Sequence, residues 1–80
     1  MEETTLYNLS DIEDALVETT LDEVYTALVE RGFNPVNQIV GYLTTGDPSY
    51  ITSNKDARNK ILSIERGKLI ETIVRKYLEG

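Results

Sequence analysis

The residues best suited to bind another molecule are basic and lie between positions 54 and 68. The cations of this stretch are Lys55, Arg58, Lys60, Arg66 and Lys68. Arginine forms forked hydrogen bonds with phosphate and carboxylate groups. Lys55 and Arg58 are three residues apart and can share one face of a helix. We predict that Lys55, Arg58 and Arg66 form a surface that binds a protein partner or a phosphate group, the alternative being an ordinary solvated face.

Two hydroxyl side chains near the N-terminus, Thr4 and Thr5, are candidate phosphorylation sites. Residues 1–10 contain too few apolar side chains to pack firmly, so we predict a flexible acidic tail there and a single helical domain over residues 11–80. Phosphorylation would add nearly two negative charges to this tail. Composition alone does not distinguish a regulatory threonine from an ordinary terminal one.

The amino-acid composition indicates that the chain is not an enzyme. Cysteine and histidine are both absent, which removes thiol nucleophiles, imidazole bases and nearly all zinc chemistry. Adjacent acids such as Asp22 and Glu23 point about 100° apart on a helix and do not converge. No glycine pattern fits a phosphate-binding loop. We predict no catalytic residue, no metal site and no cofactor.

The charges are divided unevenly along the chain. Residues 1–30 contain nine acids and no base, whereas residues 31–80 contain all eight bases and five acids. This predicts that the acidic N-terminal part rests on a basic surface of its own subunit or of a partner. The net charge of −6 opposes nonspecific nucleic-acid binding, although a nucleic-acid-binding module that uses a basic helix over residues 54–64 is the alternative function. With no signal peptide and no apolar run of membrane length, we expect a cytoplasmic protein without membrane insertion.

The first predicted helix runs from residue 11 to Arg31 and stops at Gly32. Its apolar positions form one face, consisting of Val17, Leu21, Val24 and Leu28. Ile12 and Leu16 fall on nearly the opposite side. The pattern favours one long helix that touches two partners over two helices separated by a turn near Thr19.

The second predicted helix covers residues 35–45. Asn34 is a good N-cap, Pro35 suits the first helical position, and Gly46 can adopt the left-handed conformation that ends a helix. Its apolar residues form a single stripe that we expect to face the core: Val36, Ile39, Val40 and Leu43. Gly41 lies opposite this stripe, where it either admits another backbone across a dimer interface or is a neutral choice. Tyr42 is a further interface candidate, or else the rim of the monomer core.

The second half predicts a turn at residues 47–52, a helix over residues 54–64 and a last helix that reaches Leu78, with Gly67 interrupting or bending the chain. The apolar side of the 54–64 helix is Ala57, Ile61 and Ile64. The last helix is apolar over about half its circumference, more than one packing surface needs. The surplus, including Tyr77, either meets a second subunit or is buried centrally in the monomer. We therefore predict an all-α fold of four to five short helices that forms a homodimer.

Several blocks of sequence together resemble one bacterial family. They are Thr4-x-x-Tyr7-Asn8, Val24-Tyr25, Gly32-Phe33-Asn34-Pro35-Val36-Asn37-Gln38-Ile39-Val40-Gly41-Tyr42-Leu43, Gly46-Asp47-Pro48-Ser49-Tyr50-Ile51, Asp56-Ala57-Arg58, Glu65-Arg66, Ile70-Glu71, Val74-Arg75 and Tyr77-Leu78. In these residues the chain resembles the IreB family of small regulators from low-GC Gram-positive bacteria.

The resemblance implies a small helical homodimer without enzymatic activity. It also implies phosphorylation by a membrane Ser/Thr kinase with extracellular cell-wall-sensing repeats, reversed by a cognate phosphatase, with Thr4 at the matched position. The unphosphorylated family protein restrains peptidoglycan synthesis and cephalosporin resistance. In one branch it promotes degradation of a peptidoglycan precursor enzyme by the Clp protease. Phosphorylation relieves these effects.

The chain departs from the family pattern at three places. A second phosphorylated threonine of the family falls at Met1 here, so phosphorylation at that position is impossible. Thr5 is a nearby hydroxyl that could substitute for it or confuse the assignment. Thr52 and Ser53 stand where the family commonly has Pro-Arg, which removes one arginine from the predicted surface. Gly67 and Lys68 replace an acidic pair, so the partner of this chain could differ.

Overall fold

Helices make up most of residues 9–80, the part of the chain that the computed structural model describes. The elements are α1 (Leu9–Glu30), α2 (Pro35–Thr45), the short 3-10 helices η1 (Pro48–Tyr50) and η2 (Asn54–Asp56), α3 (Ala57–Leu62) and α4 (Arg66–Glu79). No strand occurs in the described part, so the predicted all-α fold is confirmed. Thr4, Thr5 and most of the predicted tail lie outside the described residues, and the division into tail and domain stays a prediction.

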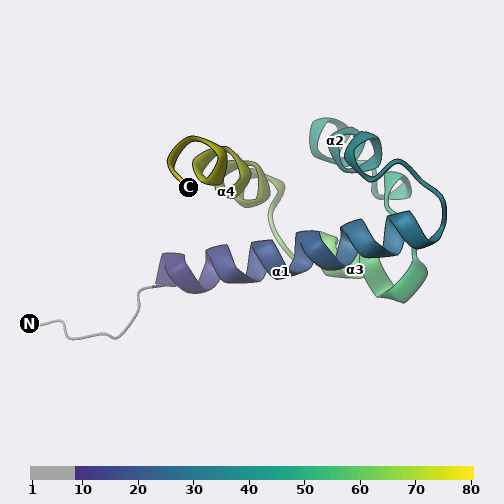
Figure 1. The fold of residues 1–80 in the computed structure, drawn as a ribbon, viewed down its shortest axis with the longest axis horizontal. Coiled ribbons are helices and arrows are strands. Elements are labelled where there is room, and N and C mark those ends of the chain that lie inside the picture. Colours follow the sequence, from purple (N-terminus) through teal and green to yellow (C-terminus); the bar gives the residue numbers. More distant parts are fainter. Residues whose placement is uncertain (1–8) are drawn as a thin grey trace, which may run out of the picture.

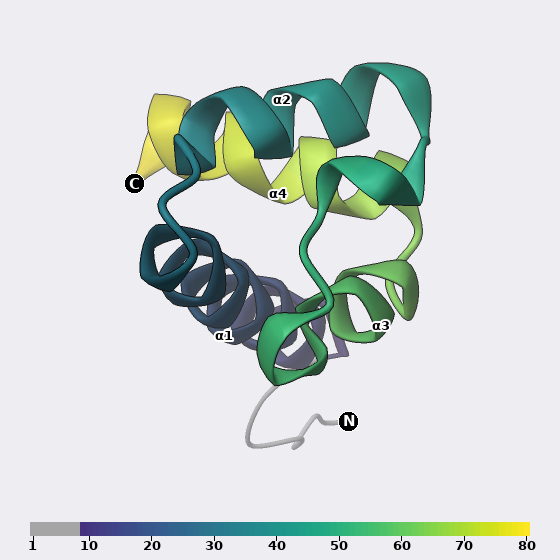
Figure 2. The same cartoon turned by 90° about the vertical axis from the view of Figure 1, so that its right-hand side faces the viewer.

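The first helix is continuous, as predicted, with no turn near Thr19. Figure 1 shows α1 running along the whole length of the molecule, with α2 and α4 crossing it. Figure 2 shows α2 and α4 together in one layer and α1 and α3 in the other. The buried apolar side chains belong to α1, α2, α3, α4 and the connections between them: Val17, Val24, Ala27, Leu28, Tyr42, Ile51, Ala57, Ile61, Ile64 and Leu69. The predicted inner faces of α1 and of the 54–64 segment are therefore confirmed.

The caps of α2 are those that the sequence predicts. The Asn34 Oδ1 atom accepts a hydrogen bond from the Asn37 backbone N–H at 3.1 Å. Gly46 ends the helix with a φ of 76°, and its N–H donates to the Tyr42 carbonyl. Because these contacts are local, they do not depend on how the rest of the chain packs.

The rotation of α2 about its own axis differs from the prediction. Val36 and Val40 are 64% and 50% exposed, whereas Tyr42 is only 3% exposed. The buried side of α2 is thus shifted around the helix, with Ile39 and Leu43 only partly buried at its edge. The expectation that the apolar stripe faces the core is confirmed for Ile39 and Leu43, which pack against it, and is wrong for Val36 and Val40.

The segment predicted as one helix over residues 54–64 is divided. Lys55 and Asp56 adopt left-handed φ values of 53° and 61°, a region that residues other than glycine enter at a cost. The α-helix begins only at Ala57 and ends at Leu62. Lys55 therefore lies outside the regular helix, and the predicted helical face shared by Lys55 and Arg58 is not formed.

The last helix leaves most of its apolar side chains uncovered. Its buried residues are Leu69 and Thr72, while the exposed ones are Ile70, Ile73, Val74, Tyr77 and Leu78. Central burial of α4 within the monomer is therefore wrong. Gly67 is the second residue of α4, so it does not interrupt the chain. No helix in residues 9–80 is both long and apolar enough to cross a membrane.

Candidate partner-binding surface

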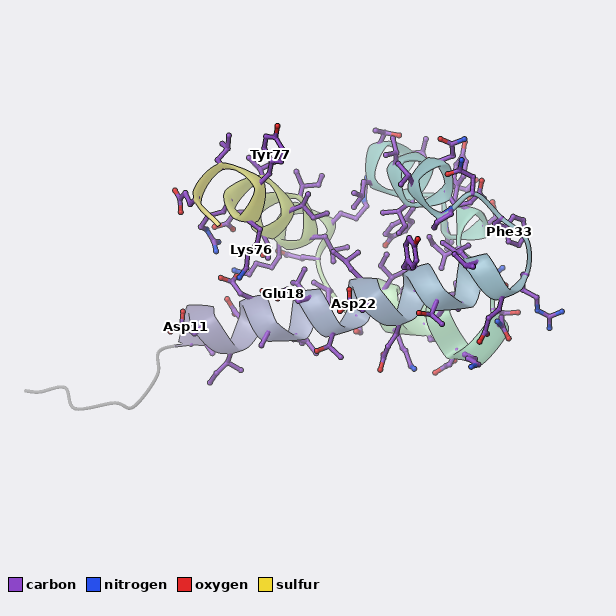
Figure 3. All side chains as sticks on the ribbon, in the orientation of Figure 1. Asp11, Glu18, Asp22, Phe33, Lys76 and Tyr77 are labelled. Atoms are coloured by element: carbon purple, nitrogen blue, oxygen red, sulfur yellow. The ribbon has the colours of Figure 1, made fainter. Side chains whose placement is uncertain are left out.

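Most basic side chains of the second half are paired with acids of α1. Within residues 9–80, α1 forms ion pairs with later residues at Lys55–Glu30 (2.9 Å), Lys60–Glu23 (3.3 Å), Lys68–Glu13 (3.4 Å), Lys68–Asp14 (3.5 Å), Arg75–Asp14 (2.6 Å) and Lys76–Glu18 (2.7 Å). Figure 3 shows Glu18 and Lys76 meeting between α1 and α4. The prediction that the acidic N-terminal part rests on a basic surface of its own subunit is confirmed for α1.

Asp14 is the centre of the most shielded group of charges. It accepts hydrogen bonds from Arg75 at 2.6 Å and from the buried Thr72 hydroxyl at 3.3 Å, and Lys68 lies 3.5 Å away. Burial alone would raise the pKa of this carboxyl group, but the hydrogen bond and charge of Arg75, together with Lys68, outweigh it and hold the pKa below its usual range. These contacts fasten α4 to the first half of α1.

Lys55 is held by the end of α1. Its Nζ donates to Glu30 Oε2 at 2.9 Å, and Asn54 Nδ2 donates to Glu30 Oε1 at 3.0 Å and to the Ala27 carbonyl at 3.1 Å. The hydrogen bonds from Lys55 and Asn54 lower the pKa of Glu30. Glu30 thus fixes the loop that carries the two left-handed residues. No local sequence pattern predicts this contact, since the partners are distant in the chain.

Arg58 and Arg66 are used differently. Arg58 Nε donates to the Ile51 carbonyl at 2.8 Å, and Arg66 Nη1 donates to the Leu43 carbonyl at 3.0 Å. Neither guanidinium forms an ion pair with a residue of the described part. Each group has five N–H donors, so one hydrogen bond to a main-chain oxygen orients it and leaves further donors and the charge for an acidic partner.

Both arginines are attached to the segment formed by the end of α2 and by η1. The Arg66 guanidinium covers Gly46 so closely that a Cβ atom there would lie 2.8 Å from Arg66 Cζ. Ile51, which anchors Arg58, directly follows η1 and is fully buried. The structure therefore connects Arg58 and Arg66 to one segment, whereas it directs Lys55 to α1.

The three predicted interface residues lie in different environments. A Cβ atom at Gly41 would come within 2.4 Å of the Tyr50 ring, so this side of α2 is occupied by the chain's own side chain and needs no partner to explain the glycine. Tyr42 is a core residue and presents no surface for an interface. Tyr77 is 87% exposed, and Figure 3 shows it pointing away from α1.

An apolar groove opens between α1, α2 and α4. This α2–α4 groove has a volume of about 340 Å³ and is lined by Leu21, Asp22, Tyr25, Val36, Ile39, Val40, Leu43 and Ile73. Its walls include the side chains that the sequence assigned to the core. No group of three or more acidic side chains within residues 9–80 is arranged to hold a metal ion.

Comparison with known protein families defines the class of this molecule. The chain matches the family model described as IreB regulatory phosphoprotein over residues 2–79, nearly its whole length. The chain is therefore a member of the class of regulatory phosphoproteins. The chain belongs to the IreB family, as its sequence blocks predicted.

Proposed function

We propose that this chain is a cytoplasmic, non-enzymatic regulator of peptidoglycan synthesis and cephalosporin resistance, switched by a membrane Ser/Thr kinase and its cognate phosphatase. The observation that carries this proposal is the family match, because its range includes both Thr4 and Thr5. Thr4 is the acceptor we favour, since it occupies the matched family position. In the unphosphorylated state the protein would restrain peptidoglycan synthesis. One mechanism for this restraint is that the protein promotes Clp-dependent proteolysis of a peptidoglycan precursor enzyme.

Arg58 and Arg66 are the proposed contact residues for the partner. Their orientation by main-chain carbonyls and their lack of ion pairs among the described residues support this role. Lys55 has a smaller part in the proposal, because Glu30 already neutralises it. A phosphorylated tail would either occupy these arginines or repel an acidic partner from them, and both routes weaken partner binding.

Nucleic-acid binding through residues 54–64 is the less supported function. Of the cations in this segment, Lys55 and Lys60 pair with Glu30 and Glu23 of α1. A surface that neutralises phosphates needs several uncompensated cations side by side, and Arg58 is what remains here.

A homodimer is the proposed assembly, and the α2–α4 groove is its proposed interface. The exposed Val36 and Val40 line this groove beside Ile73 of α4. A contiguous exposed apolar surface is a characteristic of sites that bind another protein. Val40→Glu should convert the dimer into a monomer in sedimentation equilibrium, because it places a charge in the groove. If the Val40→Glu protein sedimented like the wild type, the α2–α4 groove would not be the dimer interface.

Complementation of a deletion strain tests the regulatory proposal in cells. Thr4→Ala should lower cephalosporin resistance, since the restraint can no longer be released. Arg58→Gln should behave like the deletion, with circular dichroism confirming that it folds. Lys60→Gln is the matched control, because it removes a cation from the same helix that is already paired with Glu23. If the Arg58→Gln strain had wild-type resistance, the proposed role of the arginines in partner binding would be wrong.

A further inference from the structure

A second exposed apolar surface lies at the start of α1. Leu9, Ile12 and Leu16 are 68%, 50% and 56% exposed. Their spacing of three and four residues places them on one face of the helix. Figure 1 shows these turns of α1 extending past α3. We call Leu9, Ile12 and Leu16 the α1 stripe. Such a stripe is typical of a helix that docks into an apolar groove of another protein.

The α1 stripe leads into an acidic cavity. This open cavity, between α1 and the start of α4, has a volume of about 680 Å³, and Leu16, Val17 and Ile64 give it an apolar lining. Its charged lining residues are Glu13, Glu65, Lys68 and Glu71. Lys68 is engaged by Glu13 and Asp14, so the carboxylates dominate. The surface therefore fits a partner that combines apolar side chains with lysine or arginine.

A second copy of the chain does not offer basic side chains from α1 beside its own α1 stripe. Residues 9–30 contain no basic residue, so two α1 stripes brought together would place carboxylates against carboxylates. Like charges held opposite each other at an interface are costly. The α2–α4 groove offers a second copy an apolar surface with one acidic lining residue, Asp22. The α1 stripe is thus better matched to a different protein.

We propose that the α1 stripe and the adjoining acidic cavity dock the catalytic domain of the kinase that phosphorylates the N-terminal threonines. This inference rests on the proposed function. Leu9 follows Thr4 by five positions, and five extended residues span at most about 18 Å. A kinase held on the stripe would therefore have the acceptor hydroxyl close by at a high effective concentration. Docking of this kind lowers the KM for the protein substrate and leaves kcat unchanged.

Steady-state phosphorylation by the purified kinase catalytic domain tests the inference. The substrates are the wild type, the double variant Leu9→Gln/Ile12→Gln, and Val29→Gln as control. Val29 is 47% exposed on the same helix but far from the stripe in sequence. Glutamine retains a good helix propensity. We expect KM to rise about tenfold for the double variant with kcat unchanged, because two of the three apolar anchors that would enter a groove of the kinase are lost. We expect wild-type values for Val29→Gln.

Each other outcome has a distinct meaning. An equal KM for wild type and double variant, with both phosphorylated, overturns the docking site and leaves the proposed function intact. A double variant that becomes monomeric in sedimentation equilibrium assigns the stripe to a second copy and overturns the inference. No phosphate incorporation into the wild type by an active kinase overturns the proposed function and, with it, this inference.

Discussion

Gly41→Ala should destabilise the protein even though alanine is the better helix former. Gly41 lies in the middle of α2, where alanine would normally gain up to about 1 kcal/mol. The added Cβ would lie 2.4, 2.5 and 2.9 Å from three atoms of the Tyr50 ring. Overpacking of this kind costs about 1–3 kcal/mol. The expected net loss in the free energy of unfolding is therefore up to about 2 kcal/mol.

A double-mutant cycle isolates the contact with Tyr50. In a Tyr50→Ala background the obstruction is gone, so Gly41→Ala should now stabilise by up to about 1 kcal/mol, and the coupling energy should be about 1–3 kcal/mol. Gly67→Ala is the matched control, because no atom lies within 4 Å of its added Cβ. It should be neutral or stabilising in either background.

Urea unfolding followed by far-UV circular dichroism measures these differences. All variants are compared at one protein concentration, because the proposed dimerisation would contribute to apparent stability. If Gly41→Ala stabilised the wild-type background as much as the Tyr50→Ala background, the Tyr50 ring would not be seated against α2. Such a result would contradict the orientation of α2 described above.

Two further predictions concern the cap and the charges. Asn34→Ala should lower the free energy of unfolding by about 1 kcal/mol in the same urea assay, because the Asn37 N–H loses its capping acceptor; an unchanged midpoint would contradict the cap. The lowered pKa of Asp14 means that its carboxylate contributes stability that is fully present above the ordinary pKa of about 4 and is lost as the pH falls through the lower folded value. Asp14→Asn should therefore flatten the acid limb of a plot of stability against pH, and an acid limb as steep as that of the wild type would exclude this role.

The parts of the fold that the sequence predicts correctly are those governed by neighbouring residues. Asn34 and Gly46 lie at the two ends of α2, and their roles follow from the conformations these residues favour. The continuous α1 follows from the regular spacing of Val17, Val24 and Leu28. In each case the physical cause lies within a few positions along the chain.

The incorrect predictions concern features that are determined by contacts between residues distant in the sequence. The orientation of α2 depends on Tyr50, whose ring lies against Gly41, and on Arg66, which donates to the Leu43 carbonyl. The left-handed Lys55 is held by Glu30, which lies 25 positions earlier. Periodicity averages over the residues of one helix and contains no information on such partners, so it wrongly places Val36 and Val40 of α2 in the core.

The sequence predicts which basic residues are candidates for the partner-binding surface, but not which of them pair with acids of the same chain. Arg58 and Arg66 donate to main-chain carbonyls, and their binding role stays a prediction, whereas Lys55 is paired with α1. The excess of acids in the first thirty residues did indicate that bases elsewhere would be neutralised. Which bases these are depends on how α1 lies against α3 and α4, and a single sequence does not contain that information.

Phosphosite mapping is the most direct test of the account. The purified protein is incubated with ATP and the cell-wall-sensing Ser/Thr kinase, and the modified residue is identified by intact and fragment mass spectrometry. We expect one phosphate on Thr4 and loss of labelling in Thr4→Ala, with Thr5→Ala as the matched control. An N-terminus that stays unmodified by a kinase active on another substrate would contradict the central claim that this protein is switched through its acidic tail.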